Sequence, residues 1–219
     1  MAQSRLSGEG YEMGKIKEIG RRASGRRKRK PVVYLICEGS ETEIRYFRKF
    51  RSRGCSIDIV PISSQHKSAD RLVEKVRPTI AYAPYYPDEG DMVWCVFDRD
   101  ENTNEMLARA QRLATRSGFR IAFSNPAFEI WFLLHYHDQT APVENCGDVI
   151  KLLKKKGRLE QYEKTMDVYE QIKPLQEMAI ARAKKRVEAL ASSHIKILTR
   201  DSNPVTTVAE LVEYLNSKQ

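Results

Sequence analysis

Three acidic residues directly follow two apolar segments of strand length. Glu38 comes after Val32–Cys37, and Asp98 and Asp100 come after Met92–Phe97. A carboxylate at the tip of a buried strand is unfavourable unless something compensates its charge. Alternation along an extended backbone predicts that the side chains of Asp98 and Asp100 lie on one side. Because carboxylate oxygens are ligands that Mg²⁺ and Mn²⁺ prefer, we expect these acids to bind one of these ions.

The chemistry expected of such an ion is phosphodiester hydrolysis, because it can activate water and stabilise the charge that develops on a phosphate. The alternative is that the acids are ordinary solvated loop residues, since an isolated Asp-x-Asp motif is a weak signal. Two features favour a site: Gly39 after Glu38 permits a tight turn, and the two strands can be neighbours. We therefore interpret Glu38, Asp98 and Asp100 as metal ligands and catalytic residues.

Four further polar residues are candidates for the same site. Glu129 lies in an otherwise apolar segment, so we expect it to have a partner. It is either a fourth catalytic carboxylate or part of a salt bridge that holds a helix to the sheet. Glu43 either stabilises a helix dipole or binds a second metal ion. His135 is a proton carrier, a phosphate ligand or a core histidine, and Asn125 is expected to cap the helix that follows it.

The elements that must position these residues alternate between strand and helix. Apolar runs predict strands at 32–37, 57–62, 92–97 and 120–123. Helical spacing predicts helices at 41–51, 68–80, 104–117 and 127–135. Such alternation is typical of an α/β fold with a mostly parallel sheet flanked by helices. The carboxyl ends of its strands form one crevice, and both groups of acids lie there.

The rest of the chain is predicted to be helical. Helices are expected at 148–156 and 169–191, with Pro174 splitting or kinking the second, and Asn203-Pro204 is expected to open a last helix. We therefore divide the chain into a basic flexible arm (1–30), an α/β core (31–145) and a helical C-terminal region that packs on the core (146–219).

Positive charge is concentrated in the arm. Residues 1–31 hold ten Lys and Arg against three Glu, which accounts for seven of the nine net positive charges. A stretch without an apolar face is expected to be flexible, and it either neutralises nucleic-acid phosphates or serves as a solubilising tail. The predicted nucleic-acid contacts are Arg26, Arg27, Lys28, Arg29 and Lys30 in the arm and His66, Lys67, Arg71 and Arg99 beyond it.

Several classes of protein are disfavoured. No apolar run approaches the roughly 20 residues that cross a bilayer, and no secretory signal is readable. The four cysteines contain no Cys-x-x-Cys pair, which argues against a zinc site. Cys37 and Cys95 fall in predicted buried strands, where a free thiol acts as a small apolar side chain. We therefore expect a cytoplasmic protein without a membrane partner.

The motifs together resemble known families. Val32–Gly39 resembles the opening strand and glutamate of the Toprim domain, and Val96–Asp100 resembles its Asp-x-Asp strand. Cys37–Glu43 and Ser124–His135 resemble the RloB family, and Ser202-Asn203-Pro204 also fits. The resemblance covers roughly residues 30–217 and leaves the basic arm outside.

This resemblance implies a Toprim-like nuclease domain from prokaryotic restriction and anti-phage (abortive infection) loci. It implies an ABC-type, RloA-like ATPase partner and a relationship to the Toprim effector of the PARIS defence system, which attacks tRNA. The residue matching Glu38 acts as general acid/base or metal ligand, and those matching Asp98 and Asp100 hold the metal.

The leading hypothesis is a Mg²⁺- or Mn²⁺-dependent nuclease that acts on RNA, including tRNA, or on DNA. The alternative is a non-catalytic nucleic-acid-binding or regulatory subunit with a Toprim fold. A third hypothesis is a latent enzyme that an ATPase partner holds inactive. A homodimer is compatible with each.

Overall fold

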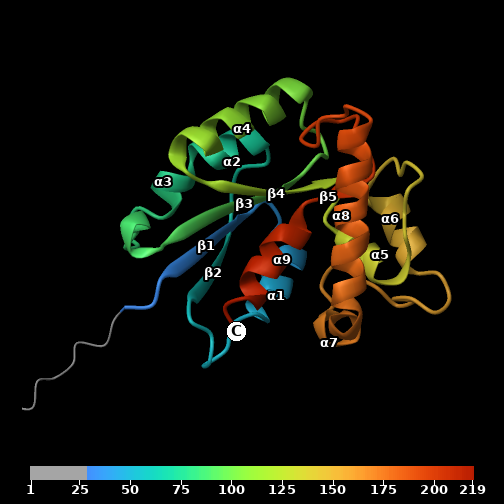
Figure 1. Ribbon diagram of the computed structural model, residues 1–219, viewed down its shortest axis with the longest axis horizontal. Coiled ribbons are helices and arrows are strands. Elements are labelled where there is room, and N and C mark those ends of the chain that lie inside the picture. Colours follow the sequence, from blue (N-terminus) through green and yellow to red (C-terminus); the bar gives the residue numbers. More distant parts are fainter. Residues whose placement is uncertain (1–28) are drawn as a thin grey trace, which may run out of the picture.

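The computed structural model describes residues 29–219, in which one sheet is covered by helices on both faces (Figure 1). The sheet order is β2-β1-β3-β4-β5, with β1 to β4 parallel and β5 antiparallel to β4. The strands are β1 (Val32–Cys37), β2 (Asp58–Ser63), β3 (Met92–Asp98), β4 (Arg120–Asn125) and β5 (Val205–Thr206). The expected α/β fold with a mostly parallel sheet is confirmed. Arg26, Arg27 and Lys28 of the predicted arm lie outside the described residues.

The helices form two layers. In Figure 1, α2, α3 and α4 lie over one face of the sheet, and α1, α5 and α9 lie over the other. The helices are α1 (Thr42–Arg48), α2 (Ala69–Glu74), α3 (Val76–Thr79), α4 (Asn104–Ser117), α5 (Glu129–Tyr136), α6 (Cys146–Leu153), α7 (Tyr169–Ile172), α8 (Gln176–Ser192) and α9 (Val208–Asn216), with 3₁₀ turns η1 (Pro87–Glu89) and η2 (Lys173–Leu175). Within 29–219, none of them is long and apolar enough to cross a membrane.

The apolar run of β1 reflects burial on both faces of the sheet. Val33 and Leu35 pack in the core beneath α1, α5 and α9, whereas Tyr34 and Ile36 pack in the core beneath α2 and α4. Alternate side chains of a strand point to opposite faces, so a central parallel strand needs apolar residues at every position. This explains why strand length, rather than alternation, is the signal in the sequence.

Two prolines divide helices that helical spacing alone would join. The helix expected at 68–80 is broken into α2 and α3, because Pro78 has no N–H to donate to the carbonyl of Glu74, where α2 ends. The split predicted at Pro174 is confirmed, since η2 separates α7 from α8. These prolines act in the same way, but only the second was included in the prediction.

The prediction for the last segment is wrong at its start. Asn203-Pro204 does not open a helix: β5 follows it directly and pairs with Ser124 and Asn125 at the end of β4. Only then does α9 begin, at Val208. The helical C-terminal region therefore also contributes an edge strand to the sheet, next to the carboxyl end of β4 and so at the end of the sheet where the predicted site lies.

Candidate active site

Glu38 and Asp98 lie next to each other at the carboxyl ends of β1 and β3, which are neighbours in the sheet. Glu38 Oε2 accepts a hydrogen bond from the backbone N–H of Asp98 at 3.1 Å. Asp98 Oδ2 accepts one from the N–H of Phe128 at 3.0 Å, which ties the end of β3 to the residue before α5. The sheet thus brings together acids that are 60 residues apart in the sequence.

Asp100 also lies near Glu38 and Asp98, but a turn positions it, and not the strand as was expected. β3 ends at Asp98, and Asp100 lies in the following turn with a positive φ of 26°. The prediction that alternation in an extended strand places Asp98 and Asp100 on one side is therefore wrong, although both residues line one pocket. Arg99 takes no part in lining that pocket. Its guanidinium donates to the carbonyl of Glu144 at 2.7 Å and to Oδ1 of Asn125 at 3.3 Å.

Glu43 approaches from the first turn of α1, where it is buried. Its Oε1 accepts a hydrogen bond from the N–H of Gly39 at 3.3 Å. A Cβ at residue 39 would overlap the Glu43 carboxylate as it lies, so a larger residue there would displace this carboxylate. The glycine after Glu38 therefore allows a second carboxylate to approach the backbone.

Glu129 is the first residue of α5, and only 2% of its surface is exposed. Its Oε1 accepts a hydrogen bond from the hydroxyl of Tyr162 at 3.2 Å, and its Oε2 accepts one from the thiol of Cys146 at 3.4 Å. The ammonium of Lys164 lies 4.0 Å from Oε1. The expected partner of Glu129 is therefore a cation, Lys164, which lies on a loop and not on the sheet. Glu129 also lines the same pocket as the other acids.

Together these side chains surround a pocket of about 390 Å³, which we call the acidic pocket. Its acidic residues are Glu38, Glu41, Glu43, Asp98, Asp100 and Glu129. Glu41 is ion-paired with Arg45 at 2.6 Å on the surface. Among the described residues that line the pocket, only Lys67 and Lys164 are basic. Negative charge therefore exceeds positive charge in the acidic pocket.

Burial and mutual repulsion raise the pKa values of these carboxyls. Burial, with the charges of Asp100 and Glu43, raises the pKa of Glu38 to about 7. Burial, with the charges of Glu43, Glu129 and Glu38, raises the pKa of Asp98 well above its ordinary value. Burial and the charge of Glu129 also raise the pKa of Glu43. A positive charge in the acidic pocket would relieve this repulsion.

The donor atoms fit a hard divalent cation, because these carboxylates supply only oxygen ligands. Glu38, Asp98 and Asp100 are the residues that would hold Mg²⁺ or Mn²⁺. As the side chains lie, however, no three Asp, Glu, His or Cys residues within 29–219 form a group that could hold a metal ion. Binding an ion therefore requires the carboxylates to move closer together.

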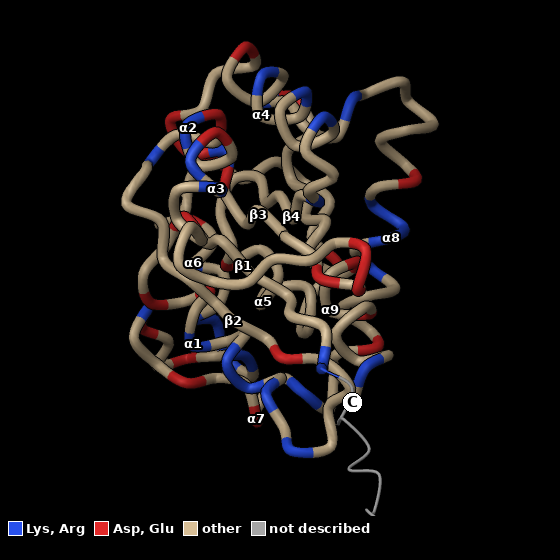
Figure 2. Tube along the Cα trace, turned by 90° about the vertical axis from the view of Figure 1, so that its left-hand side faces the viewer, with Lys and Arg blue, Asp and Glu red and all other residues tan. Residues whose placement is uncertain are grey.

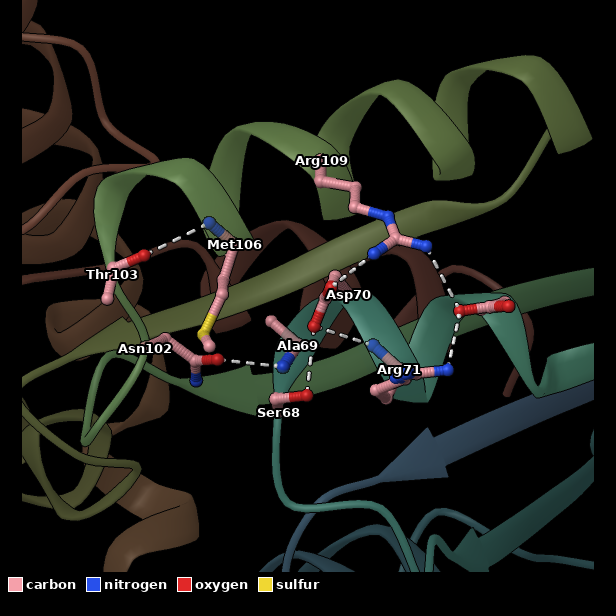
Figure 3. Close-up of polar contacts among 9 residues, drawn as sticks. Ser68, Ala69, Asp70, Arg71, Asn102, Thr103, Met106 and Arg109 are labelled. Atoms are coloured by element: carbon pink, nitrogen blue, oxygen red, sulfur yellow. Dashed lines mark hydrogen bonds and ion pairs between the residues drawn. The ribbon is translucent and has the colours of Figure 1, made fainter.

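The turn that carries Asp100 is fixed by residues that the sequence did not single out. Figure 3 shows Asn102 between this turn and the start of α2, where its Oδ1 accepts a hydrogen bond from the N–H of Ala69 at 2.8 Å. Its Nδ2 donates to the carbonyl of Asp98 at 2.9 Å. From the other side, Arg200 donates to the carbonyls of Asp100 at 3.2 Å and Asn102 at 3.0 Å.

The prediction that Asn125 caps α5 is wrong. The capping position is Phe128, which makes no side-chain hydrogen bond. The fully buried amide of Asn125 instead donates to the carbonyls of Thr199 and Arg200, both at 3.2 Å. It fastens the segment before β5 to the end of β4, and it does not line the acidic pocket.

His135 lies near the far end of α5 and does not line the acidic pocket. Its Nδ1 is 2.9 Å from the carbonyl of Trp131, and Nε2 has no hydrogen-bond partner among the described residues. Burial lowers the pKa of His135 to about 4. This geometry supports the core histidine among the alternatives weighed for it.

The predicted basic contacts do not form one surface. Lys67 lines the acidic pocket, whereas His66 and Arg71, which lie close to it in the chain, do not. Arg71 is 3.5 Å from the carboxylate of Glu74 in the same helix. Lys67 is therefore the residue of this group that could contact a substrate bound near the acids.

Two other predicted contacts lie at the start of β1. Arg29 is paired with Glu89 at 3.1 Å and Asp91 at 2.9 Å, which neutralise its charge. Lys30 is exposed, and its Nζ donates to the carbonyl of Cys55 at 2.8 Å. Neither residue lines the acidic pocket.

The partners of Glu129 were missed because their sequence carries no signal. Tyr162 and Lys164 lie between α6 and α7, in a segment without helical or strand periodicity. Cys146 was not considered for the site. Burial, together with the charge and hydrogen bond of Glu129, raises the pKa of its thiol to about 12.

Comparison with known proteins gives a family. The model of a family described as RloB-like protein matches residues 33–215, a range that includes all the acids of the pocket. Neither the curated proteins nor the solved structures contain a match to the chain. Since the matched range spans most of the sequence, the chain belongs to the RloB-like protein family.

Proposed function

We propose that the chain is a metal-dependent nuclease with a Toprim-type active site in which Glu38, Asp98 and Asp100 hold Mg²⁺ or Mn²⁺. The observation that carries the proposal is the meeting of six acidic side chains in one pocket at the carboxyl ends of two parallel strands. Glu38 and Asp98 are half-buried there, beside the buried Glu43 and Glu129. Sites in sheets of this type form at that edge. The resemblance of residues 32–39 and 96–100 to the Toprim domain agrees with this assignment.

Bound in the acidic pocket, such an ion would supply an activated water and stabilise charge on a phosphate. The residues of the chain would do the rest. Without an ion, Glu38 has a pKa of about 7 and can hold or release a proton near neutral pH, as a general acid or base must. As a ligand of the ion it would stay ionised, because a nearby cation lowers the pKa of a carboxyl. Lys67 and Lys164 would bind phosphate oxygens at the rim.

The substrate class that we propose is RNA, including tRNA, or DNA. By its resemblance to restriction and anti-phage families, the protein would act in prokaryotic defence with an ABC-type ATPase as its partner. This part of the proposal depends on the resemblance and not on the geometry of the acidic pocket.

A non-catalytic nucleic-acid-binding or regulatory subunit is the second candidate. One observation favours it: within residues 29–219 no three potential ligands are grouped to hold an ion as they lie. Glu38 and Asp98 each accept a backbone hydrogen bond and so also have a structural role. This candidate predicts nucleic-acid binding without cleavage under any metal.

The test is cleavage of labelled RNA and DNA by the full chain with Mg²⁺, with Mn²⁺ and with EDTA. We expect metal-dependent cleavage that Glu38→Gln and Asp98→Asn each reduce by at least about a hundredfold. Glu213→Gln is the matched control, because this carboxylate is ion-paired with Lys184 on the surface, away from the acidic pocket. Full cleavage by both folded variants would refute the assigned site, and binding without cleavage would favour the second candidate.

A further inference from the structure

A hollow of about 840 Å³ lies beside β2, at the opposite end of the sheet from the acidic pocket. Val32 and Tyr34 from the first half of β1 line it, whereas Glu38 follows the end of that strand. At about 3.3 Å per residue, Glu38 lies roughly 13 Å along the strand from Tyr34 and roughly 20 Å from Val32. The hollow is therefore a separate feature of the molecule.

Basic side chains surround this hollow. Lys30, Arg51 and Arg53 line it and are exposed, and Asp58 is the only acidic residue among its described lining. Within residues 29–219, no carboxylate lies within ion-pair distance of Arg51 or Arg53. Figure 2 shows Lys and Arg segments gathered at the end of the molecule near the C-terminus, where Lys218 O accepts a hydrogen bond from the N–H of Ser56 at 2.7 Å.

Exposed aromatic rings lie in the loop that forms the other wall. Ala83 and Pro84 line the hollow. Close to them in the chain, Tyr82 is 104% exposed, and Tyr86 is 50% exposed with the guanidinium of Arg29 over one face of its ring at 5.0 Å. Tyr85 differs, because its ring packs edge-on against that of Tyr34 at 6.3 Å. Packing thus explains Tyr85 but leaves the ring of Tyr82 entirely in solvent.

The edge of β2 is poorly suited to binding another strand. The N–H groups of Asp58 and Ser64 donate toward β1, so every second residue between them does the same and the others donate outward. Pro61 occupies one of the outward positions and has no N–H. Strand addition at this edge would lack a central hydrogen bond, so a partner that binds by charge and stacking fits better.

Unpaired arginines on one wall of a hollow and exposed tyrosines in the loop of the other wall suit single-stranded nucleic acid, since cations contact the phosphates and aromatic rings stack on the bases. We propose that Lys30, Arg51, Arg53, Tyr82 and Tyr86, which we call the distal surface, bind the backbone and bases of a single strand. The inference rests on the proposed function only in naming nucleic acid as the anion. The role of the distal surface is to bind part of a nucleic-acid strand at a distance from the acidic pocket.

The test is fluorescence anisotropy of the full chain with a labelled single-stranded RNA of about 20 nucleotides, in EDTA so that no cleavage is expected. Arg51→Glu/Arg53→Glu should weaken binding by about tenfold or more and lower the slope of log affinity against log salt by about 1.4. Tyr82→Ala should weaken binding about fivefold or more. Arg112→Glu/Arg116→Glu on the exposed side of α4 is the matched control for charge.

Equal RNA binding by the Arg51→Glu/Arg53→Glu variant and the Arg112→Glu/Arg116→Glu control would overturn the inference. A change in oligomeric state that only the Arg51→Glu/Arg53→Glu variant shows would also overturn it. These results are independent of catalysis. If the distal pair loses binding while no metal supports cleavage, the inference stands and the nuclease proposal fails. If cleavage depends on Glu38 but RNA binding is unchanged by substitution of Arg51 and Arg53, the nuclease proposal stands and the inference fails.

Discussion

Asp98 is the acid that the fold accommodates least well. It accepts one hydrogen bond, from the N–H of Phe128 at 3.0 Å, while burial and nearby carboxylates raise its pKa well above the ordinary value. Because the folded pKa exceeds the unfolded one, the stability linked to this group is present at low pH and is lost as pH rises through the folded pKa. Asparagine keeps an oxygen for Phe128 but carries no charge.

Asp98→Asn should therefore stabilise the metal-free protein by at least about 1 kcal/mol at a pH of about 8. It should also abolish stabilisation by Mn²⁺, which for the unaltered chain is about 3 kcal/mol at a hundredfold excess over Kd. Thermal unfolding with EDTA and with Mn²⁺ measures both effects. Asp138→Asn, at an exposed ion pair with Lys185, is the control. A lower midpoint for Asp98→Asn in EDTA would contradict the prediction.

His135 provides a pH-dependent test of the core. Burial lowers its folded pKa to about 4, below the unfolded value of about 6.5. Stability linked to neutral His135 is therefore present above about pH 6.5 and is lost progressively as the pH falls toward 4. When the pH falls from about 7.5 to about 5, the free energy of unfolding measured in urea should drop by about 2 kcal/mol more for the unaltered chain than for His135→Gln. His194→Asn, at an exposed histidine, should behave like the unaltered chain.

The turn between β3 and α4 decides where Asp100 lies, and Asn102 connects it to α2. Asn102→Ala would leave the N–H of Ala69 without its partner and release the carbonyl of Asp98. We expect a loss of about 1–3 kcal/mol in unfolding free energy and weaker Mn²⁺ binding. Thr103→Ala, which removes the cap of α4 beside it, should cost about 1 kcal/mol without changing Mn²⁺ affinity. Equal Mn²⁺ affinity in both variants, measured by calorimetry, would contradict this role.

The elements were predictable where a local cause defines their ends. α4 matches its predicted range because Thr103 caps its start and Gly118, with a φ of 69°, ends it. β1 also matches, since its apolar run is bounded by Pro31 and Glu38. β5 could not be predicted, because two residues carry no periodicity and its position depends on pairing with β4.

The acidic residues of the candidate site could be predicted from the sequence, whereas the residues that contact them could not. Glu38 and Asp98 could be found because each ends an apolar strand, and parallel order brings such ends together. Lys164 and Arg200 come from distant segments without a motif, so only the folded chain shows that they approach Glu129 and Asp100.

Two surfaces of opposite charge lie at opposite ends of the sheet, with the acidic pocket at the carboxyl ends of the strands and the distal surface at their amino ends. The chain enters the described structure at that second end, through Arg29 and Lys30. Residues 1–28 hold eight Lys and Arg and three Glu. The basic N-terminal sequence and the distal surface are thus close to each other in the chain.

Deleting residues 1–28 should weaken binding of single-stranded RNA and lower the slope of log affinity against log salt by between about 1 and 6, according to how many of its cations contact phosphates. Anisotropy titrations at several salt concentrations in EDTA measure this slope. The thermal midpoint serves as the control, and we expect it to stay the same. An unchanged slope would show that the N-terminal charges do not bind the strand.

The most direct measurement is anomalous scattering from crystals of the full chain grown with Mn²⁺. The proposed active site predicts a peak in the acidic pocket bonded to oxygens of Glu38, Asp98 and Asp100, and no peak there in crystals of Asp98→Asn. Ordered crystals of the unaltered chain that bind Mn²⁺ elsewhere would contradict it. So would crystals in which the carboxylates of Glu38 and Asp98 keep their backbone hydrogen bonds and bind no ion at saturating Mn²⁺.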